Sequence, residues 1–76
     1  MTFLQALTAD DRAHRSACEE IEALRADFTA AGAPGIAEEI AAQYGRGAYW
    51  LPTDVLRTGI AYFSARLDEY RALRAA

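Results

Sequence analysis

The chain contains one histidine and one cysteine, and these two residues are four positions apart. At that spacing His14 and Cys18 share one face of a helix. Asp10 and Glu22 fall on the same face, so the four side chains resemble half of a metal site. A zinc site needs three or four ligands, and the sequence has no second histidine or cysteine. A cysteine–histidine nucleophile would also need a group that orients the base. We therefore interpret the pair as a helix histidine beside a buried thiol, and we predict no metal and no cofactor.

Adjacent carboxylates are the other candidates for chemistry, and they occur three times: Glu19–Glu20, Glu38–Glu39 and Asp68–Glu69. Neighbouring residues point in different directions on a helix, so each pair is typical of a solvated face rather than of an acid–base pair. Arg15 is spaced to form surface ion pairs with Glu19 and with Glu22. These pairs predict exposed charge rather than catalysis.

The glycine-rich GRG at residues 45–47 lacks the spacing, the lysine and the preceding strand of a phosphate-binding loop. It is typical of a helix stop followed by a flexible connection. With no catalytic, metal or nucleotide motif, the sequence predicts that the protein is not an enzyme.

The length of 76 residues predicts a single helical domain that spans residues 1–76. A chain this short buries only about 60–65% of its unfolded surface, so its core is thin and contacts with a partner would add to its stability.

Charge is distributed unevenly along the chain, whose net charge is −3 with eight arginines and no lysine. Residues 1–44 carry eight acidic residues and three arginines, a net charge of −5, and the remainder is basic by two charges. The acidic part argues against direct nucleic-acid binding, which needs a basic face. It favours binding to a basic surface of another protein.

A lone cysteine cannot form an internal disulfide, so a cytoplasmic location is predicted. The first residues, MTFLQALTADD, lack the basic and apolar regions of a signal peptide. No apolar run approaches the ~18 residues of a membrane-spanning helix, so no membrane association is expected.

Apolar residues recur at helical spacing through most of the chain. A short N-terminal turn or helix with Phe3, Leu4 and Leu7 is predicted first. A long helix from about Ala9 to Ala31 follows, with Thr8 and Asp11 spaced as a capping box and with Gly32 as the residue that ends it.

The second predicted helix is residues 34–44, with Pro34 at its first position, and the last begins with Thr53 as its N-cap. Leu73 extends the apolar stripe of the last helix, and Gly59 allows a close approach between helices. The prediction is a small all-α, three-helix antiparallel bundle with an additional N-terminal turn or helix. Its expected core residues are Ile21, Leu24, Phe28, Ile36, Ile40, Leu56, Ile60, Phe63 and Leu67.

The segment TDVLRTGI at residues 53–60 resembles the second helix of ribbon-helix-helix antitoxins. In that helix a capping Ser or Thr precedes an acid, an aliphatic pair, an arginine and a small-apolar step. IAEEIAAQYGRGAY at residues 36–49 resembles their first helix and turn. The resemblance implies a DNA-binding regulator. That family reads DNA through a basic strand before its first helix, whereas this chain has RADFTAAGAPG at residues 25–35.

The aromatic pair Tyr49–Trp50 lies in the connection before the last helix, where two interpretations are open. The rings either pack under the helices as part of the core or contact a partner, since tyrosine and tryptophan are frequent in binding hot spots. Tyr62 lies off the apolar stripe of the last helix and would add to the same surface.

These features predict a non-enzymatic inhibitor or regulator that occupies a basic surface of a partner protein, of the kind that anti-CRISPR proteins of phages and mobile elements represent. An antitoxin-like DNA-binding regulator and a small helical subunit of a larger complex are the alternatives. A homodimer is also expected, because a two-fold interface adds the apolar burial that a small monomer lacks. The predicted partner-binding residues are Glu19, Glu22, Asp27, Glu38, Glu39, Tyr49, Trp50 and Tyr62.

The substitution Trp50→Ala separates the two roles of the tryptophan. A core ring would make the variant lose ~3–5 kcal/mol of stability, whereas a partner contact would leave its melting temperature unchanged and cost about 2 kcal/mol of binding. We expect a partly buried ring, with fluorescence moderately blue-shifted from that of free tryptophan. A fully blue-shifted monomer that unfolds on substitution would remove Trp50 from the binding surface.

Overall fold

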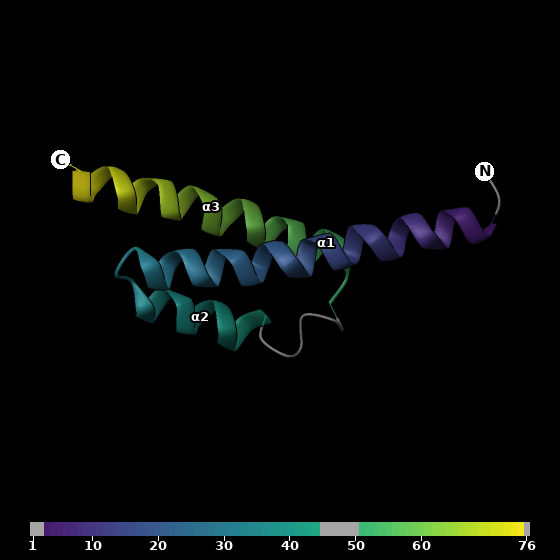
Figure 1. The fold of residues 1–76 in the computed structure, drawn as a ribbon, viewed down its shortest axis with the longest axis horizontal. Coiled ribbons are helices and arrows are strands. Elements are labelled where there is room, and N and C mark those ends of the chain that lie inside the picture. The colour runs from purple at the N-terminus through teal and green to yellow at the C-terminus, as the bar shows by residue number, and fades with distance from the viewer. Residues whose placement is uncertain (1–2, 45–50, 76) are drawn as a thin grey trace.

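Three α-helices make up the structure, a computed structural model that describes residues 3–44 and 51–75, with the side chains of the first helix from Asp10 onward. The helices are α1 (Phe3–Ala30), α2 (Pro34–Tyr44) and α3 (Thr53–Ala75) (Figure 1). Neither described range contains a strand. The predicted all-α fold of three helices is confirmed.

The helix α2 runs back along α1, and α3 then runs in the same direction as α1, so consecutive helices are antiparallel (Figure 1). α1 packs against both of the other helices, and its first turns extend beyond them. This extension makes the molecule elongated, at 51 × 22 × 16 Å with a radius of gyration of 14.3 Å. A compact chain of this length would have a radius of gyration of about 11 Å.

The start of α1 differs from the prediction. The expected N-terminal turn and long helix form one continuous helix of 28 residues, and Thr8 lies inside it rather than at its N-cap. The segment between Phe3 and Ala9 contains neither proline nor glycine. A capping pattern by itself does not interrupt a helix when nothing in the sequence breaks the hydrogen-bond ladder.

The end of α1 has the geometry that the sequence predicts. Gly32 has a φ of +89°, the left-handed conformation that glycine adopts without strain. Its amide donates to the carbonyl of Thr29 (3.2 Å), and the amide of Ala33 donates to the carbonyl of Phe28 (2.8 Å). These two bonds form a Schellman motif, and Pro34 then begins α2 as expected.

The last helix starts and ends slightly differently from the prediction. The carbonyl of Pro52 accepts the first helical bond, from the amide of Leu56 (3.2 Å), so Thr53 is the first helical residue rather than the N-cap. Leu73 is 78% exposed and does not extend the core. At about 100° per residue, Leu73 lies in line with the exposed Val55 rather than with the buried Leu56, so it points away from the core.

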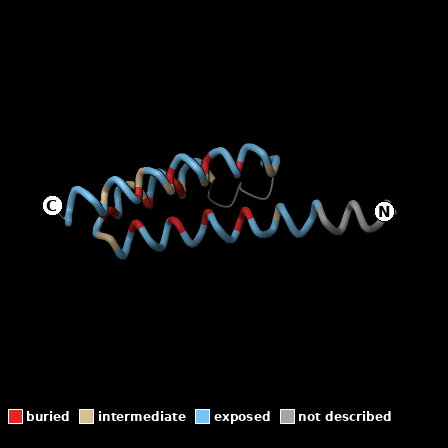
Figure 2. Tube along the Cα trace, turned by 90° about the horizontal axis from the view of Figure 1, so that it is seen from above, coloured by how far each residue is buried: buried red, intermediate tan, exposed pale blue. Residues whose placement is uncertain are grey.

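The core lies on the sides of the helices that face one another (Figure 2). Seven of the nine predicted core residues are buried; the other two, Ile36 and Ile60, are partly buried and pack against the cluster. Small side chains fill much of the remaining space between the helices: Ala17, Cys18, Ala33 and Ala37.

The ring of Phe63 connects all three helices. It makes edge-to-face contacts with Phe28 of α1 at a centroid distance of 6.4 Å and with Tyr44 of α2 at 6.2 Å. Its neighbour Tyr62 packs against it at 5.0 Å. Such pairs each contribute about 0.5–1.5 kcal/mol beyond the area they bury.

Gly59 gives Tyr44 the space to reach this position. A Cβ atom at residue 59 would lie 2.6 Å from the Cζ of Tyr44, far inside van der Waals contact. The close approach predicted for Gly59 is therefore present, and it is made by a side chain of α2.

Ion pairs differ from those predicted. Arg15 pairs with Asp11 (3.4 Å) rather than with the acids that follow it. Arg57 of α3 pairs with Glu20 of α1, which shows which side of α1 faces α3. These contacts are exposed and add little stability.

We predict opposite effects for two glycine-to-alanine substitutions. Gly59→Ala should destabilise the protein by about 1–2 kcal/mol, because the displaced Tyr44 ring loses contacts that the gain in helix propensity does not replace. Gly35→Ala, whose Cβ would meet no atom within 4 Å, should stabilise it by up to about 1 kcal/mol. Thermal denaturation followed by circular dichroism measures both, and a Gly59→Ala variant as stable as Gly35→Ala would contradict the prediction.

Candidate functional site

The three predicted acids of α1 are exposed but do not share one face. Asp27 lies seven residues after Glu20, so it is on the side that faces α3. Glu19 and Glu22 lie away from that side. Glu22 is paired with Arg25 at 3.4 Å, so part of its charge is compensated.

The two predicted acids of α2 are also exposed. The sequence of this helix, PGIAEEIAAQY, contains no basic residue, so the negative charge of Glu38 and Glu39 is not compensated within it. Four of the five predicted acids have no ion-pair partner within residues 10–44 and 51–75: Glu19, Asp27, Glu38 and Glu39.

Of the three predicted aromatic residues, the structure describes one. Tyr49 and Trp50 lie outside the described residues. Tyr62 is 53% exposed, as expected from its place off the apolar stripe. The guanidinium of Arg66 lies 5.6 Å from the centre of the Tyr62 ring and donates to its hydroxyl (3.1 Å).

A groove between α2 and α3, which the sequence analysis did not identify, lies next to Tyr62. It has a volume of about 370 Å³. We call it the α2–α3 groove, and its lining residues are Gln43, Tyr44, Val55, Thr58, Gly59, Tyr62 and Phe63. Most of these side chains are apolar, so the groove suits an apolar side chain of a binding partner.

His14 connects α1 to the segment that leads into α3, and Cys18 lies beside it on α1. The Nε2 of His14 donates to the carbonyl of Leu51 at 2.8 Å, which assigns the proton to that nitrogen. The Sγ of Cys18 lies 3.9 Å from Nδ1, and Cys18 is buried. Within the described part of the chain, no three potential ligands cluster to hold a metal ion.

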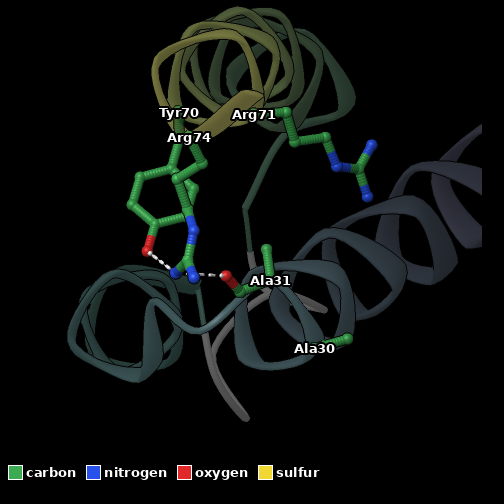
Figure 3. Close-up of a pocket in the computed structure, with 5 residues that line it drawn as sticks. All are labelled: Ala30, Ala31, Tyr70, Arg71 and Arg74. Atoms are coloured by element: carbon green, nitrogen blue, oxygen red, sulfur yellow. Dashed lines mark hydrogen bonds between the residues drawn. The ribbon is translucent and has the colours of Figure 1, made fainter. Parts of the chain in front are cut away.

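A second hollow, of about 350 Å³, lies where the end of α3 meets the end of α1 (Figure 3). Arg74 donates to the carbonyl of Ala31 (3.2 Å) and to the hydroxyl of Tyr70 (3.0 Å), and Tyr70 donates to the carbonyl of Gly32 (3.2 Å). Arg71 extends away from these groups. The guanidinium of Arg74 thus lies at the C-terminus of α1, where it compensates partial negative charge. This hollow is interpreted as a helix cap.

No protein-family model matches the chain, and no curated protein and no solved structure shows a significant match to it. None of the described helices is long and apolar enough to cross a membrane.

The environment of Cys18 predicts low reactivity. Burial, with a smaller contribution from the neighbouring Glu19, raises the pKa of its thiol. The folded protein at pH 8 should react with a thiol reagent at least about ten times more slowly than the unfolded chain. Because the pKa is raised on folding, the stabilising contribution is complete below the ordinary thiol pKa and is lost as pH rises through the raised one.

Cys18→Ala should consequently lose less stability than the native chain at alkaline pH. Rapid labelling of Cys18 in the folded protein would contradict the predicted low reactivity. An equal loss of stability at alkaline pH in Cys18→Ala would contradict the raised pKa of the thiol.

Proposed function

We propose that this protein is a non-enzymatic, cytoplasmic inhibitor or regulator that acts by occupying a basic surface of another protein. The observation that carries the proposal is the set of exposed carboxylates on α1 and α2 without ion-pair partners among the described residues. Carboxylates that are not compensated within their own chain are available to a basic partner and accelerate its association.

The two acids of α2 are the most favourable part of this surface. Glu38 and Glu39 are adjacent, exposed and on a helix without a basic residue. Proteins of this size, charge and residue content include anti-CRISPR proteins of phages and mobile elements, and we propose this protein to be of that kind.

The antitoxin-like alternative receives less support. The place of its DNA-reading strand corresponds to the end of α1 and the turn at Gly32. The acidic surfaces of α1 and α2 would also repel a phosphate backbone. Nuclease treatment during affinity capture detects any nucleic acid that the chain retains.

The test is affinity capture from a bacterial lysate with the immobilised chain, before and after nuclease treatment. Binding of the captured protein is then measured against salt concentration. Glu38→Lys/Glu39→Lys should weaken this binding by about tenfold or more at low salt and reduce its salt dependence, with little change in melting temperature. The matched control is Asp68→Lys/Glu69→Lys, an adjacent acidic pair on α3 that changes the net charge equally.

A captured protein that binds both variants as tightly as the native chain would reject the acidic surface of α2. Equal weakening by both pairs would indicate an effect of total charge rather than of this surface. Nuclease-sensitive capture, or retention of DNA alone, would favour the antitoxin-like regulator instead.

A further inference from the structure

The exposed large apolar side chains of α3 lie on a single line. Val55 is 43% exposed, Tyr62 is 53% exposed and Leu73 is 78% exposed, and these are the large apolar residues that the described side chains leave exposed. Their spacings are seven and eleven residues. At about 100° per residue, all three fall within about 20° of one another around the helix. We call these residues the exposed apolar line.

The two ends of this line are different and complementary. At the Val55 end the line borders the α2–α3 groove, a concave apolar site of about 370 Å³. At the other end Leu73 is exposed in the last turns of α3, and the end of this helix extends past the end of α1 (Figure 1). Each molecule thus has an exposed apolar side chain, Leu73, and an apolar groove that such a side chain could fill.

We propose that the exposed apolar line is a homodimer interface, in which α3 pairs antiparallel with α3 of a second copy. Residue 64 marks the level along α3 that is halfway between Val55 and Leu73. A two-fold axis that crosses the line at this level brings Leu73 of each copy opposite Val55 and the groove of the other copy. An isologous interface needs a surface that is complementary to itself, and the line meets this requirement.

The middle of the line is compatible with the same axis. Tyr62 and Arg66 are each two residues from residue 64. The two-fold axis therefore brings Tyr62 of one copy opposite Arg66 of the other. Within one chain the guanidinium of Arg66 already lies over the Tyr62 ring at 5.6 Å. Arginine stacked on aromatic rings is a favourable contact at a partly desolvated interface.

The size of the line sets the expected strength of the dimer. Its ends are 18 residues apart, about 27 Å along a helix. A contact between single helices of this length is smaller than a standard stable interface, so we expect a dissociation constant on the order of 10 µM.

This inference is independent of the proposed function. It places Tyr62 in the dimer rather than on the partner surface, and leaves the acids of α1 and α2 free. Glu38→Lys/Glu39→Lys should therefore remain dimeric, whatever its effect on a partner protein.

Sedimentation equilibrium of the full chain between about 1 and 500 µM tests the dimer. The native chain should shift from monomer to dimer in this range. Leu73→Glu should weaken association by about tenfold or more, without a lower melting temperature at high dilution, because Leu73 is exposed in the monomer. The matched control is Ala61→Glu, which adds the same charge at an exposed position of α3 away from the line; it should dimerise like the native chain.

Disulfide cross-linking tests the register. In Val55→Cys/Leu73→Cys the two cysteines are about 27 Å apart within one chain, beyond the reach of a disulfide, but opposite each other between copies. Oxidation should give a covalent dimer with the double variant, and none with either single variant. A native chain that stays monomeric to about 500 µM would overturn the proposal, and so would a dimer that survives Leu73→Glu or fails to cross-link.

Discussion

The edge-to-face contact between Tyr44 and Phe63, at 6.2 Å, is the constraint on which the arrangement of the helices depends. α2 has only 11 residues, and a helix of that length is marginal in water without packing. Its aromatic end reaches α3 only because residue 59 is a glycine. Phe63 in turn packs against Phe28 of α1, so a single ring makes the position of each helix depend on the other two.

The rest of the core specifies less, because much of it is alanine. Ala17, Ala33 and Ala37 are buried and allow close approach of the helices, but small side chains do little to prevent one helix from sliding along another. Directional polar contacts occur at both ends of the bundle, where they fix this register. His14 binds the carbonyl of Leu51 at one end, and Arg74 binds the carbonyl of Ala31 at the other.

Helix positions and ends were largely predictable from the sequence because their signals are local. Gly32 in the left-handed conformation ends α1, and Pro34 is the first residue of α2, as these local signals predict. The prediction was wrong where a local signal needs a global context. The capping pattern at Thr8 is common inside helices. For Leu73 the spacing itself was misread, because the apolar stripe of α3 continues at residue 74, and Leu73 lies off it.

The candidate surfaces were predictable to a similar degree. Exposure of Tyr62 and of the five acids follows from their places on the helices. The α2–α3 groove does not, since it is formed by Tyr44 of one helix and Val55 of another, and only the packing of both on α1 brings them together. The spacing of Val55, Tyr62 and Leu73 was visible in the sequence, but it gained meaning only once these residues were seen to be exposed.

The acids proposed to bind a partner lie on α1 and α2, whereas the exposed apolar line lies on α3. α1 contacts α3 at Arg57, on roughly the opposite side of α3 from Val55. A second copy bound along the exposed apolar line would therefore leave α1 of both copies on the outside, and a dimer would present two acidic surfaces related by a two-fold axis. Such a dimer would bind tightly only to a partner that offers two basic sites at matching separation. A monomeric target would be bound no better by the dimer than by a single chain, so dimerisation would then serve stability, by covering apolar surface that a chain of this size cannot bury alone.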